Sequence, residues 1–357
     1  MSERLPLREN LRGAEPYGAP QFDVPVQLNV NENPYPPSEA LVAAAAAAVA
    51  AALRTANRYP DREASALRAD LAAYLGHTLD ASRVWAANGS NEIMLQLLQA
   101  FGGPGRTAVS FAPTYSMYPE YARNTSTNWV VGRRAADFTI DPAHALDVIA
   151  QHDPSVVLLA SPNNPTGTAL PLELVRKLHD AAPDAVIVVD EAYAEFRRPG
   201  VPSALTLLNG LPRLAVTRTM SKAFAFAGVR VGYVAGSAEL VDALRVVRLP
   251  YHLSAVTQAT ARAALQHAEE LLGRVAELRA TRDDLVAWLR SRGFDVADSD
   301  ANFVLVGTFA DRHATWSELL ARGVLVRETG PDGWLRVSIG TPDQMRAFQD
   351  ALVEVTR

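Results

Sequence analysis

An asparagine, an aspartate, a tyrosine and a lysine each follow an apolar, β-branched run of the sequence. They are Asn164, Asp190, Tyr193 and Lys222. Runs without polar alternation predict strands that are buried on both faces of a parallel sheet. Ligands of such sheets bind beyond the carboxyl ends of the strands. We therefore expect the four side chains to converge on one crevice.

This set of side chains meets the needs of pyridoxal 5'-phosphate, which joins a lysine as a Schiff base and withdraws electrons. Lys222 is the expected Schiff-base lysine and general base. Asp190 is expected to keep the ring nitrogen protonated, because a nearby carboxylate favours the charged pyridinium. Asn164 and Tyr193 are donors for the phenolic oxygen of the ring. We predict that Lys222, Asp190 and Tyr193 are catalytic.

The sequence also carries groups that suit a phosphate. Residues 88–92 open a predicted helix, and the N–H groups at a helix N-terminus bind anions. Ser90 and Asn91 are the expected contacts there. Two hydroxyls and a cation flank the lysine, which gives three further cofactor-binding candidates: Thr219, Ser221 and Arg230.

Each of these features alone has an ordinary structural interpretation. A lysine after a strand is usually a solvated surface residue. Asp190 could be a helix N-cap, and residues 161–167 could form only a turn, since Asn, Pro and Gly are turn residues. Their joint occurrence at three strand ends is difficult to explain by local structure alone, so it favours the cofactor site.

The pattern around these residues is α/β. Helical stretches such as 65–75, 92–101 and 172–181 alternate with short apolar runs, which indicates βαβ units and a parallel sheet. The clearest predicted strands are 107–111, 155–160, 185–189 and 214–217.

The pattern changes near residue 249. Residues 254–289 have the spacing of a long helix, and the alanine-rich segment 41–53 predicts a helix with Ser38 as its N-cap. We predict three parts: 1–54, the N-terminal arm and first helix, which belong to the small domain; 55–248, the large cofactor-binding domain; and 249–357, the small C-terminal domain. The last part should hold strands at 303–306, 324–327 and 334–339 and a closing helix from Pro342.

Composition limits the possible partners. The 357 residues carry a net charge of −5 and include no cysteine. Basic residues are scattered among acids, whereas nucleic-acid binders usually show a basic patch, so we expect no nucleic-acid partner. The N-terminus lacks the apolar core of a signal peptide, and the apolar run 41–53 is too short to span a bilayer. We therefore expect a cytoplasmic protein without a membrane partner and without a metal.

Together the motifs resemble the fold-type I aminotransferases, specifically the histidinol-phosphate aminotransferase family. The Asn-Pro-Thr-Gly, Asp-x-x-Tyr and Ser-Lys set indicates the superfamily, and the other segments narrow it. The resemblance covers almost the whole chain, in segments 28–36, 57–61, 88–92, 113–118, 161–167, 189–193, 218–224, 227–230, 249–251, 301–303, 326–327 and 335–341. It implies an α/β fold with a large, mostly parallel sheet domain flanked by helices and a smaller, discontinuous α+β domain.

The resemblance also implies roles around the cofactor and a partner subunit. Tyr115 should stack on the ring of pyridoxal phosphate. Tyr59 should reach the cofactor phosphate of the neighbouring subunit, which implies a homodimer with shared sites.

For substrates, the resemblance implies that Arg336 binds an α-carboxylate and Arg327 the substrate phosphate, while Tyr17 and Asn33 line the substrate side chain. For each arginine, a surface salt bridge is the alternative. The implied reaction belongs to histidine biosynthesis. Histidinol phosphate and 2-oxoglutarate give imidazole-acetol phosphate and glutamate, in turn at one site.

Several positions depart from the family's commonest form. Glu328 stands where aspartate is frequent, Asn91 where an acid is common, and residues 225–226 replace a Gly-Leu pair. Three other functions remain open: an aromatic amino-acid aminotransferase, a threonine-phosphate-type decarboxylase, and a non-catalytic regulator built on an aminotransferase domain. A regulator would carry a DNA-binding module ahead of this domain, and the 37 residues before the first predicted helix are too few for one.

Overall fold

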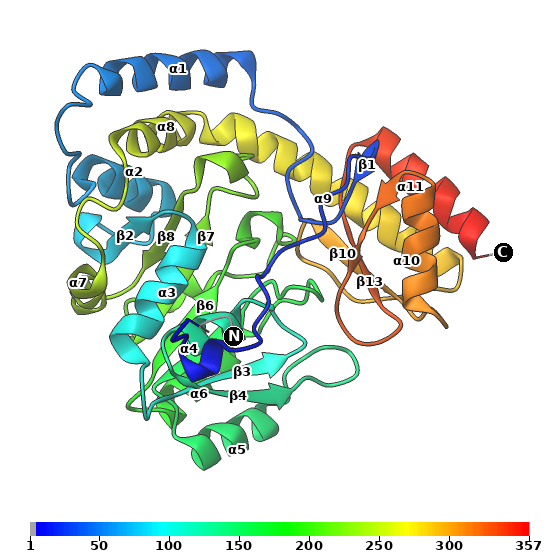
Figure 1. Cartoon of the computed structure of the whole chain (residues 1–357), viewed down its shortest axis with the longest axis horizontal. Helices are drawn as coiled ribbons and strands as arrows, with labels where there is room; N and C mark the ends of the chain where they lie inside the picture. Colours follow the sequence, from blue (N-terminus) through cyan, green and yellow to red (C-terminus); the bar gives the residue numbers. More distant parts are fainter. Residues whose placement is uncertain (1–4, 357) are drawn as a thin grey trace.

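The computed structural model describes residues 5–356 and is organised around a seven-stranded sheet (Figure 1). Its strand order is β2-β8-β7-β6-β5-β3-β4. All neighbouring pairs are parallel except those of β8, which runs antiparallel to both β2 and β7. The strands are β2 (Val84–Ala87), β3 (Thr107–Ala112), β4 (Asn128–Arg133), β5 (Val156–Ala160), β6 (Val186–Asp190), β7 (Leu214–Thr219) and β8 (Gly232–Ala235).

The predicted strands of this sheet are confirmed, with shifts of one or two residues at their ends. Helices cover both faces of the sheet, as β-α-β connections require. These are α2 (Ser65–Leu75), α3 (Ser90–Phe101), α4 (Tyr118–Asn124), α5 (Pro142–His152), α6 (Leu172–Ala181) and α7 (Ala238–Val247). Short 3-10 turns lie at Glu9–Leu11, Ala81–Arg83, Ala194–Phe196, Ala204–Leu207 and Ala227–Val229.

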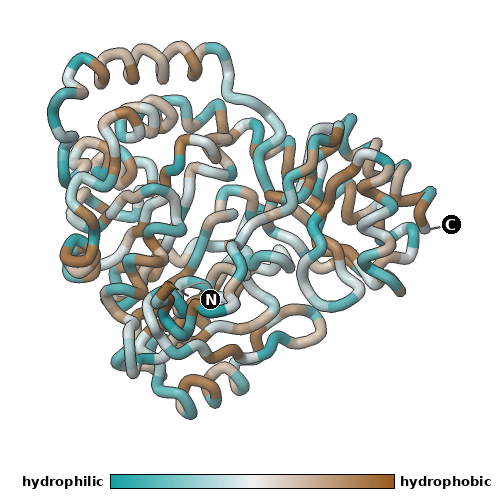
Figure 2. The backbone as a smooth tube through the Cα atoms, in the orientation of Figure 1, coloured by the Kyte–Doolittle hydropathy of each residue, from teal (hydrophilic) through white to brown (hydrophobic). Residues whose placement is uncertain are grey.

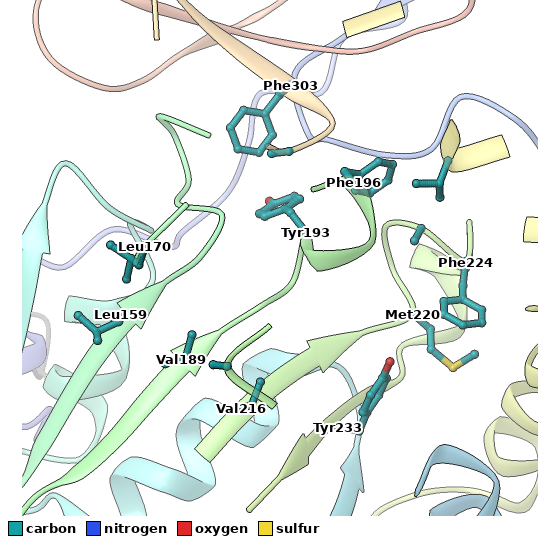
Figure 3. Packing of buried hydrophobic residues seen from close by; sticks show 14 of the residues in the cluster. Leu159, Leu170, Val189, Tyr193, Phe196, Val216, Met220, Phe224, Tyr233 and Phe303 are labelled. Carbon is teal, nitrogen blue, oxygen red and sulfur yellow. The ribbon is translucent and has the colours of Figure 1, made fainter. Parts of the chain in front are cut away.

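Two packed layers of apolar side chains enclose the sheet. Along β5, Val157 and Leu159 face one layer, whereas Val156 and Leu158 face the other. Figure 3 shows the first layer continuing past Val189 and Val216 toward the small domain. There the ring of Tyr193 meets that of Phe303 edge-on, with centroids 5.0 Å apart. The strand ends that carry the candidate residues are therefore fixed from both sides.

The small domain contains an antiparallel sheet of order β12-β13-β10-β9. Its strands are β9 (Asp295–Val296), β10 (Phe303–Gly307), β12 (Arg327–Glu328) and β13 (Leu335–Ser338), with helices α10 (Arg312–Ala321) and α11 (Pro342–Val355) beside them. The N-terminal arm joins this domain, because β1 (Val26–Gln27) pairs in parallel with β11 (Val324–Leu325).

Two predicted elements are divided in the structure. The helix predicted over 254–289 consists of α8 (Ala255–Gln266) and α9 (Ala268–Ser291). They are separated at His267, whose backbone leaves the helical conformation at φ −105° and ψ 16°. The strand predicted over 324–327 is divided into β11 and β12, which pair with different strands. Helical spacing alone does not register a single break, which explains the first difference.

The alanine-rich helix α1 (Glu39–Leu53) begins as predicted, with the Ser38 hydroxyl accepting from the Leu41 N–H at 3.2 Å. It lies along α8 and stands away from the small sheet (Figure 1). Figure 2 shows it pale to brown along its length, and Val42 and Leu53 are half-exposed on it. The division of the chain at residues 54 and 248 stays a prediction, and so does the assignment of α1 to the small domain.

Candidate active site

One pocket at the carboxyl ends of β5, β6 and β7 brings together all but two of the predicted site residues. The arm, the start of α3 and the small sheet complete its walls. Among the predicted residues, its lining contains Tyr17, Ser90, Asn91, Tyr115, Asn164, Asp190, Tyr193, Thr219, Ser221, Lys222, Arg230, Arg327 and Arg336. The two exceptions are Tyr59 and Asn33.

Lys222 lies just beyond β7 and points across the pocket toward the arm. Its ammonium donates to the carbonyl oxygen of Val30 at 2.9 Å and lies 6.0 Å from the centre of the Tyr193 ring. Burial and the positive charge of Arg336 lower the pKa of Lys222 to about 8. The amine is thus closer to neutrality than a surface lysine, as a nucleophile and proton carrier requires.

Asp190 ends β6 and is 7% exposed. Its carboxylate accepts from the hydroxyls of Tyr118 and Thr217, both at 3.1 Å, and from the Ala192 N–H at 3.2 Å. Burial raises the pKa of Asp190 to about 6, although these hydrogen bonds act in the opposite direction. The carboxylate is therefore held in one orientation, and a cation in the pocket would stabilise its negative charge.

Tyr193 and Arg336 also line the pocket. The Tyr193 hydroxyl accepts from the amides of Asn31 at 3.0 Å and Asn164 at 3.5 Å. Arg336, on β13, donates to the Asn164 side-chain oxygen and to the Asn29 carbonyl, both at 2.6 Å. Burial lowers the pKa of Arg336 to about 10.

Neither Arg336 nor Arg327 has a carboxylate within ion-pair distance among residues 5–356. In addition, the Arg336 Nε and the Arg327 Nη1 are buried and lack a hydrogen-bond partner there. Buried guanidinium groups are normally paired. Arg336 is buried and Arg327 is half-buried, and two guanidinium groups without a carboxylate on a single pocket indicate a ligand with negative groups.

The start of α3 forms a candidate phosphate cradle. Gly89 precedes the helix at φ 84°, and a Cβ placed on it would come within 2.6 Å of the Arg230 Nη2. A Cβ on Gly232 of β8 would come within 2.1 Å of the Ser90 backbone nitrogen. Arg230 itself has φ 62°, in the left-handed region that non-glycine residues rarely adopt and that is found at functional sites. The close packing brings N–H groups, the Ser221 hydroxyl and a guanidinium to one place.

The N-terminal arm lines one side of the pocket. The hydroxyls of Tyr17 and Ser116 are hydrogen-bonded at 3.0 Å, and the Arg327 Nη2 donates to the Gly18 carbonyl at 3.5 Å. Tyr115 stands beside Tyr118, ring edge to face, with centroids 5.6 Å apart. Burial raises the pKa of Tyr115, which keeps it a neutral aromatic surface at the pocket.

Asn33 differs from the prediction that it lines the substrate pocket. Its amide donates to the Ala223 carbonyl at 3.3 Å, and its side-chain oxygen caps the Tyr35 N–H at 3.0 Å. It lines a second cavity on the other side of the arm. The side chain is used to fix the arm, because Asn oxygens readily bond to the backbone two residues on.

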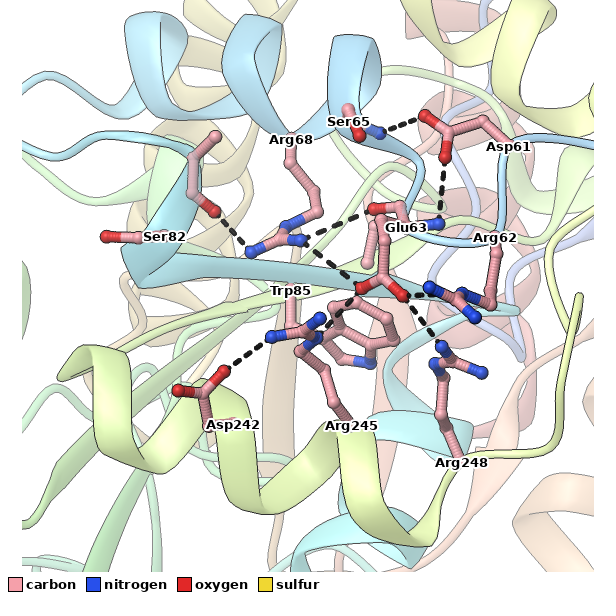
Figure 4. Close-up of polar contacts among 12 residues, drawn as sticks. Asp61, Arg62, Glu63, Ser65, Arg68, Ser82, Trp85, Asp242, Arg245 and Arg248 are labelled. Carbon is pink, nitrogen blue, oxygen red and sulfur yellow. Dashed lines mark hydrogen bonds and ion pairs between the residues drawn. The ribbon is translucent and has the colours of Figure 1, made fainter.

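Tyr59 also lies outside the pocket of its own chain. It is 79% exposed and stacks on Tyr251, with ring centroids 4.4 Å apart. Its loop is held by Glu63, whose carboxylate contacts the guanidinium groups of Arg62, Arg245 and Arg248 at 2.8 to 3.0 Å (Figure 4).

Trp85 links this cluster to the phosphate cradle. The guanidinium groups of Arg68 and Arg248 lie 5.2 and 5.7 Å from its ring centre, and His252 stacks on it at 5.3 Å. His252 is hydrogen-bonded to the Ala86 carbonyl, and its own carbonyl accepts from the Asn88 amide. The loop that carries Tyr59 and the strand end that opens α3 are thus supported by one cluster.

The structure adds residues for which no role was predicted. Tyr118 and Thr217 hold Asp190, while Asn29 and Asn31 connect the arm to Arg336 and Tyr193. All four belong to segments already identified as motifs or strands. Their partners, however, are far away in the sequence, and no local signal specifies such contacts.

The donor set fits pyridoxal phosphate. It offers a lysine with a lowered pKa, a buried carboxylate for the ring nitrogen, and two donors for the phenolic oxygen. The cradle that any Cβ at Gly89 or Gly232 would fill suits its phosphate.

No helix in the part of the chain described is long and apolar enough to cross a membrane. Within residues 5–356 there is likewise no group of three or more potential metal ligands.

Comparison with known proteins identifies relatives along the whole chain. The family model for aminotransferase class I and II matches residues 24–352. A histidinol-phosphate aminotransferase of Thermobifida fusca is 62% identical over 352 residues, covering 99% of this chain and 96% of that protein. Histidinol-phosphate aminotransferase 3 of Burkholderia lata is 63% identical over 355 residues, covering 98% of this chain and 96% of that protein.

A solved structure agrees with the fold. Histidinol-phosphate aminotransferase from Sinorhizobium meliloti, in complex with pyridoxal-5'-phosphate, has a TM-score of 0.88 to this chain at 23% identity. The match covers 99% of this chain and 98% of that one. The predicted fold class is therefore confirmed. From the family model and the full-length relatives together, the chain belongs to the histidinol-phosphate aminotransferases, within aminotransferase class I and II.

Proposed function

We propose that the protein transfers an amino group between histidinol phosphate and 2-oxoglutarate, giving imidazole-acetol phosphate and glutamate. The observation that carries this proposal is the pocket itself. It combines a lysine and a buried carboxylate with two guanidinium groups that lack a carboxylate partner among residues 5–356. Full-length relatives named histidinol-phosphate aminotransferase support the substrate.

Pyridoxal phosphate, when bound, supplies the electron sink that makes the substrate α-carbon acidic. Lys222 Nζ would then take the α-proton and deliver it to the cofactor's C4′ carbon. This step needs a neutral amine, and the lowered pKa of Lys222 provides a larger fraction of it near neutral pH.

Asp190, Tyr193 and Asn164 orient and tune this chemistry. The Asp190 carboxylate stabilises a proton on the ring nitrogen, because its burial makes a nearby cation strongly favourable. Tyr193 and Asn164 would donate to the phenolic oxygen. Tyr115 would cover the ring face, and the start of α3 with Ser221 and Arg230 would hold the phosphate.

Arg336 and Arg327 are the proposed substrate-binding arginines. We infer that Arg336 binds the α-carboxylate of glutamate, since a planar guanidinium matches a carboxylate with two hydrogen bonds. Arg327 lies at the mouth, beside Tyr17 and the arm, and would take the phosphate of histidinol phosphate. The same guanidinium can bind the distal carboxylate of glutamate. One site then serves two substrates in turn, which predicts ping-pong kinetics.

A side-by-side assay tests the proposal. Purified protein is given histidinol phosphate or phenylalanine as amino donor to 2-oxoglutarate, and glutamate formation is measured. We expect kcat/KM to be higher with histidinol phosphate. Equal or higher values with phenylalanine would make the protein an aromatic aminotransferase, and carbon dioxide release without glutamate formation would make it a decarboxylase.

We further propose that the protein works as a cytoplasmic homodimer in which Tyr59 reaches the phosphate cradle of the partner subunit. The exposure of Tyr59 supports this assignment, as do the exposed apolar residues Val246, Leu249 and Tyr251 near it. Mixing Lys222→Ala subunits with Tyr59→Phe subunits provides a test. If sites are shared, the mixed dimers contain one site with both native residues, and activity should rise above that of either variant alone.

A further inference from the structure

A second carboxylate directly follows Asp190 in the sequence. Successive side chains near the end of a strand point to opposite faces of the sheet. Asp190 lines the pocket, whereas Glu191 enters the interior and is only 1% exposed. Two carboxylates on neighbouring residues are thus both buried, at the place where the cofactor's ring nitrogen is expected.

Arg218, on β7, is the charge partner of Glu191. Its Nε donates to the Glu191 Oε2 at 2.9 Å, its Nη2 lies 2.7 Å from the same oxygen, and its Nη1 donates to the Glu195 Oε1 at 2.8 Å. The side chains of all three residues are less than a tenth exposed. Arg197 adds a contact to the Glu191 Oε1 at 3.4 Å, so two arginines balance two glutamates. Neutral donors complete the shell of Glu191: the Ser203 hydroxyl and the Ala204 N–H, both at 2.7 Å.

The two faces of the sheet are connected through the register of β6 and β7. Asp190 pairs with Thr217, whose hydroxyl donates to the Asp190 carboxylate. The next residue of β7 is Arg218, which serves Glu191 on the opposite face. The same strand pair therefore supplies a hydrogen bond to the pocket carboxylate and a counter-charge to the carboxylates behind it. Lys222 follows four residues later.

The ion pair of Arg218 and Glu191 is not explained by fold stability alone. Replacing a buried ion pair by apolar residues is often neutral or stabilising, so fold stability alone does not require it. Removing only the cation, in contrast, leaves uncompensated buried charge. Here that charge would lie beside Asp190, whose own negative charge already suffers from burial and from Glu191.

We propose that Arg218 is a positioning residue that cancels the charges of Glu191 and Glu195 behind the sheet and so keeps Asp190 an anion toward the cofactor. This inference rests on the proposed function only in requiring pyridoxal phosphate, not in its substrate. Besides Glu191, the titratable groups that act on Asp190 or line its pocket are Tyr17, Tyr115, Tyr118, Tyr121, Tyr193, Lys222, Arg230, Arg327 and Arg336. None of these contacts Glu191, so Arg218 acts on that carboxylate without touching the pocket.

Cofactor affinity measured without substrate is the direct test. Full-length apoenzyme is titrated with pyridoxal phosphate between pH 5.5 and 9, and bound cofactor is followed by absorbance. Arg218→Met should weaken binding about tenfold at neutral pH. The loss of affinity on the acidic side of the pH profile (its acid limb) should begin about one pH unit higher than in wild type. Arg218→Lys, which keeps the charge, should retain most of the affinity.

Removing the uncompensated carboxylate should reverse the loss of cofactor affinity. Glu191→Gln in the Arg218→Met background should restore more than half of the lost affinity, because no uncompensated carboxylate then lies beside Asp190. Glu195→Gln alone leaves one positive charge in excess and should move the acid limb downward. The inference is overturned if folded Arg218→Met binds like wild type, or if Glu191→Gln gives no relief.

Glu195→Gln keeps the inference testable even if Arg218→Met does not fold. If the pH dependence of cofactor affinity in Glu195→Gln equals that of wild type, the inference is contradicted. Circular dichroism and the denaturation midpoint check folding of each variant. Substrate preference does not enter these measurements. An enzyme that preferred phenylalanine would refute the proposed function and leave this test intact.

Discussion

The ammonium of Lys222 and the carbonyl oxygen of Val30 are hydrogen-bonded at 2.9 Å, so the N-terminal arm touches the centre of the chemistry. Burial and the positive charge of Arg336 lower the pKa of Lys222 to about 8. The neutral amine that attacks pyridoxal phosphate becomes abundant as the pH rises through that value.

The rate of cofactor incorporation should therefore increase with pH and level off above about 8. Rapid mixing of apoenzyme with pyridoxal phosphate, followed by absorbance, measures it. Borohydride trapping and peptide mapping should place the label on Lys222, and Lys222→Ala should give no label. A rate that is flat from pH 6.5 to 9.5 or a label on another lysine contradicts the assignment.

Tyr118→Phe should weaken cofactor binding in a pH-dependent manner. The lost hydroxyl is a hydrogen-bond donor to the Asp190 carboxylate at 3.1 Å, and its removal raises the pKa of Asp190 above its present value of about 6. Because a raised pKa means loss of the anion at higher pH, affinity should fall about tenfold near pH 6 and converge on wild type near pH 9. Tyr121→Phe is the control, since its hydroxyl contacts Asn91 and not Asp190. It should show no such pH dependence.

Gly232→Ala should damage the phosphate cradle. A Cβ at this position would lie 2.1 Å from the Ser90 nitrogen, and the neighbour is backbone that cannot rotate away. We expect cofactor affinity to fall at least tenfold and the free energy of unfolding to fall by about 1–3 kcal/mol. Gly228→Ala, which meets no atom within 4 Å, is the matched control. Equal affinities of the two variants would show that β8 and α3 do not need this close contact.

Arg327→Gln should separate phosphorylated from unphosphorylated substrates. Its guanidinium has a buried Nη1 without a partner in the part of the chain described, and removing a charged partner of a phosphate costs about 2–5 kcal/mol. We expect kcat/KM for histidinol phosphate to fall about a hundredfold and that for phenylalanine to change much less. The comparison variant is Arg312→Gln, whose guanidinium pairs with Glu328 outside the pocket. Parallel losses on both substrates would mean that Arg327 does not read phosphate.

Glu63→Gln should destabilise the loop that carries Tyr59. Burial alone would raise the pKa of Glu63, but Arg245 and Arg248 more than offset this effect and lower it. A lowered pKa stabilises the fold above the unfolded value and loses that contribution as the pH falls through the folded value. The variant should therefore be less stable by about 1 kcal/mol at pH 7, and the difference should shrink as the pH falls below 4.5, the ordinary pKa of a glutamate. Denaturant titrations on both sides of that value measure it. Asp242→Asn, at an exposed partner of Arg245, should change stability much less.

The sequence was sufficient for the large sheet and most of the site because both depend on local patterns. Strands buried on two faces appear as apolar runs, and the residues that follow them must meet at one edge. Asp190, Tyr193 and Lys222 were therefore predictable. The break at His267 was not, because the apolar spacing continues through it.

Asn33 shows a different limit. Its position on the arm is close to the pocket, but a side chain on an irregular segment can face either side. The choice was decided by hydrogen bonds to Ala223 and Tyr35. The role of Tyr118 was not predictable for a similar reason, since its partner Asp190 is 72 residues away. Contacts of this kind follow from tertiary packing, which has no periodic signature.

The pairing of β1 with β11 has a consequence for the order in which the protein is made. Val26 lies opposite Val324, and the adjoining arm residues Asn29 and Asn31 bond to Arg336 and Ser338. A ribosome releases the first of these partners at the start of translation and the second near its end. The nascent chain thus carries an unfinished pocket through most of its synthesis, and we expect truncated products that lack the last strands to be inactive.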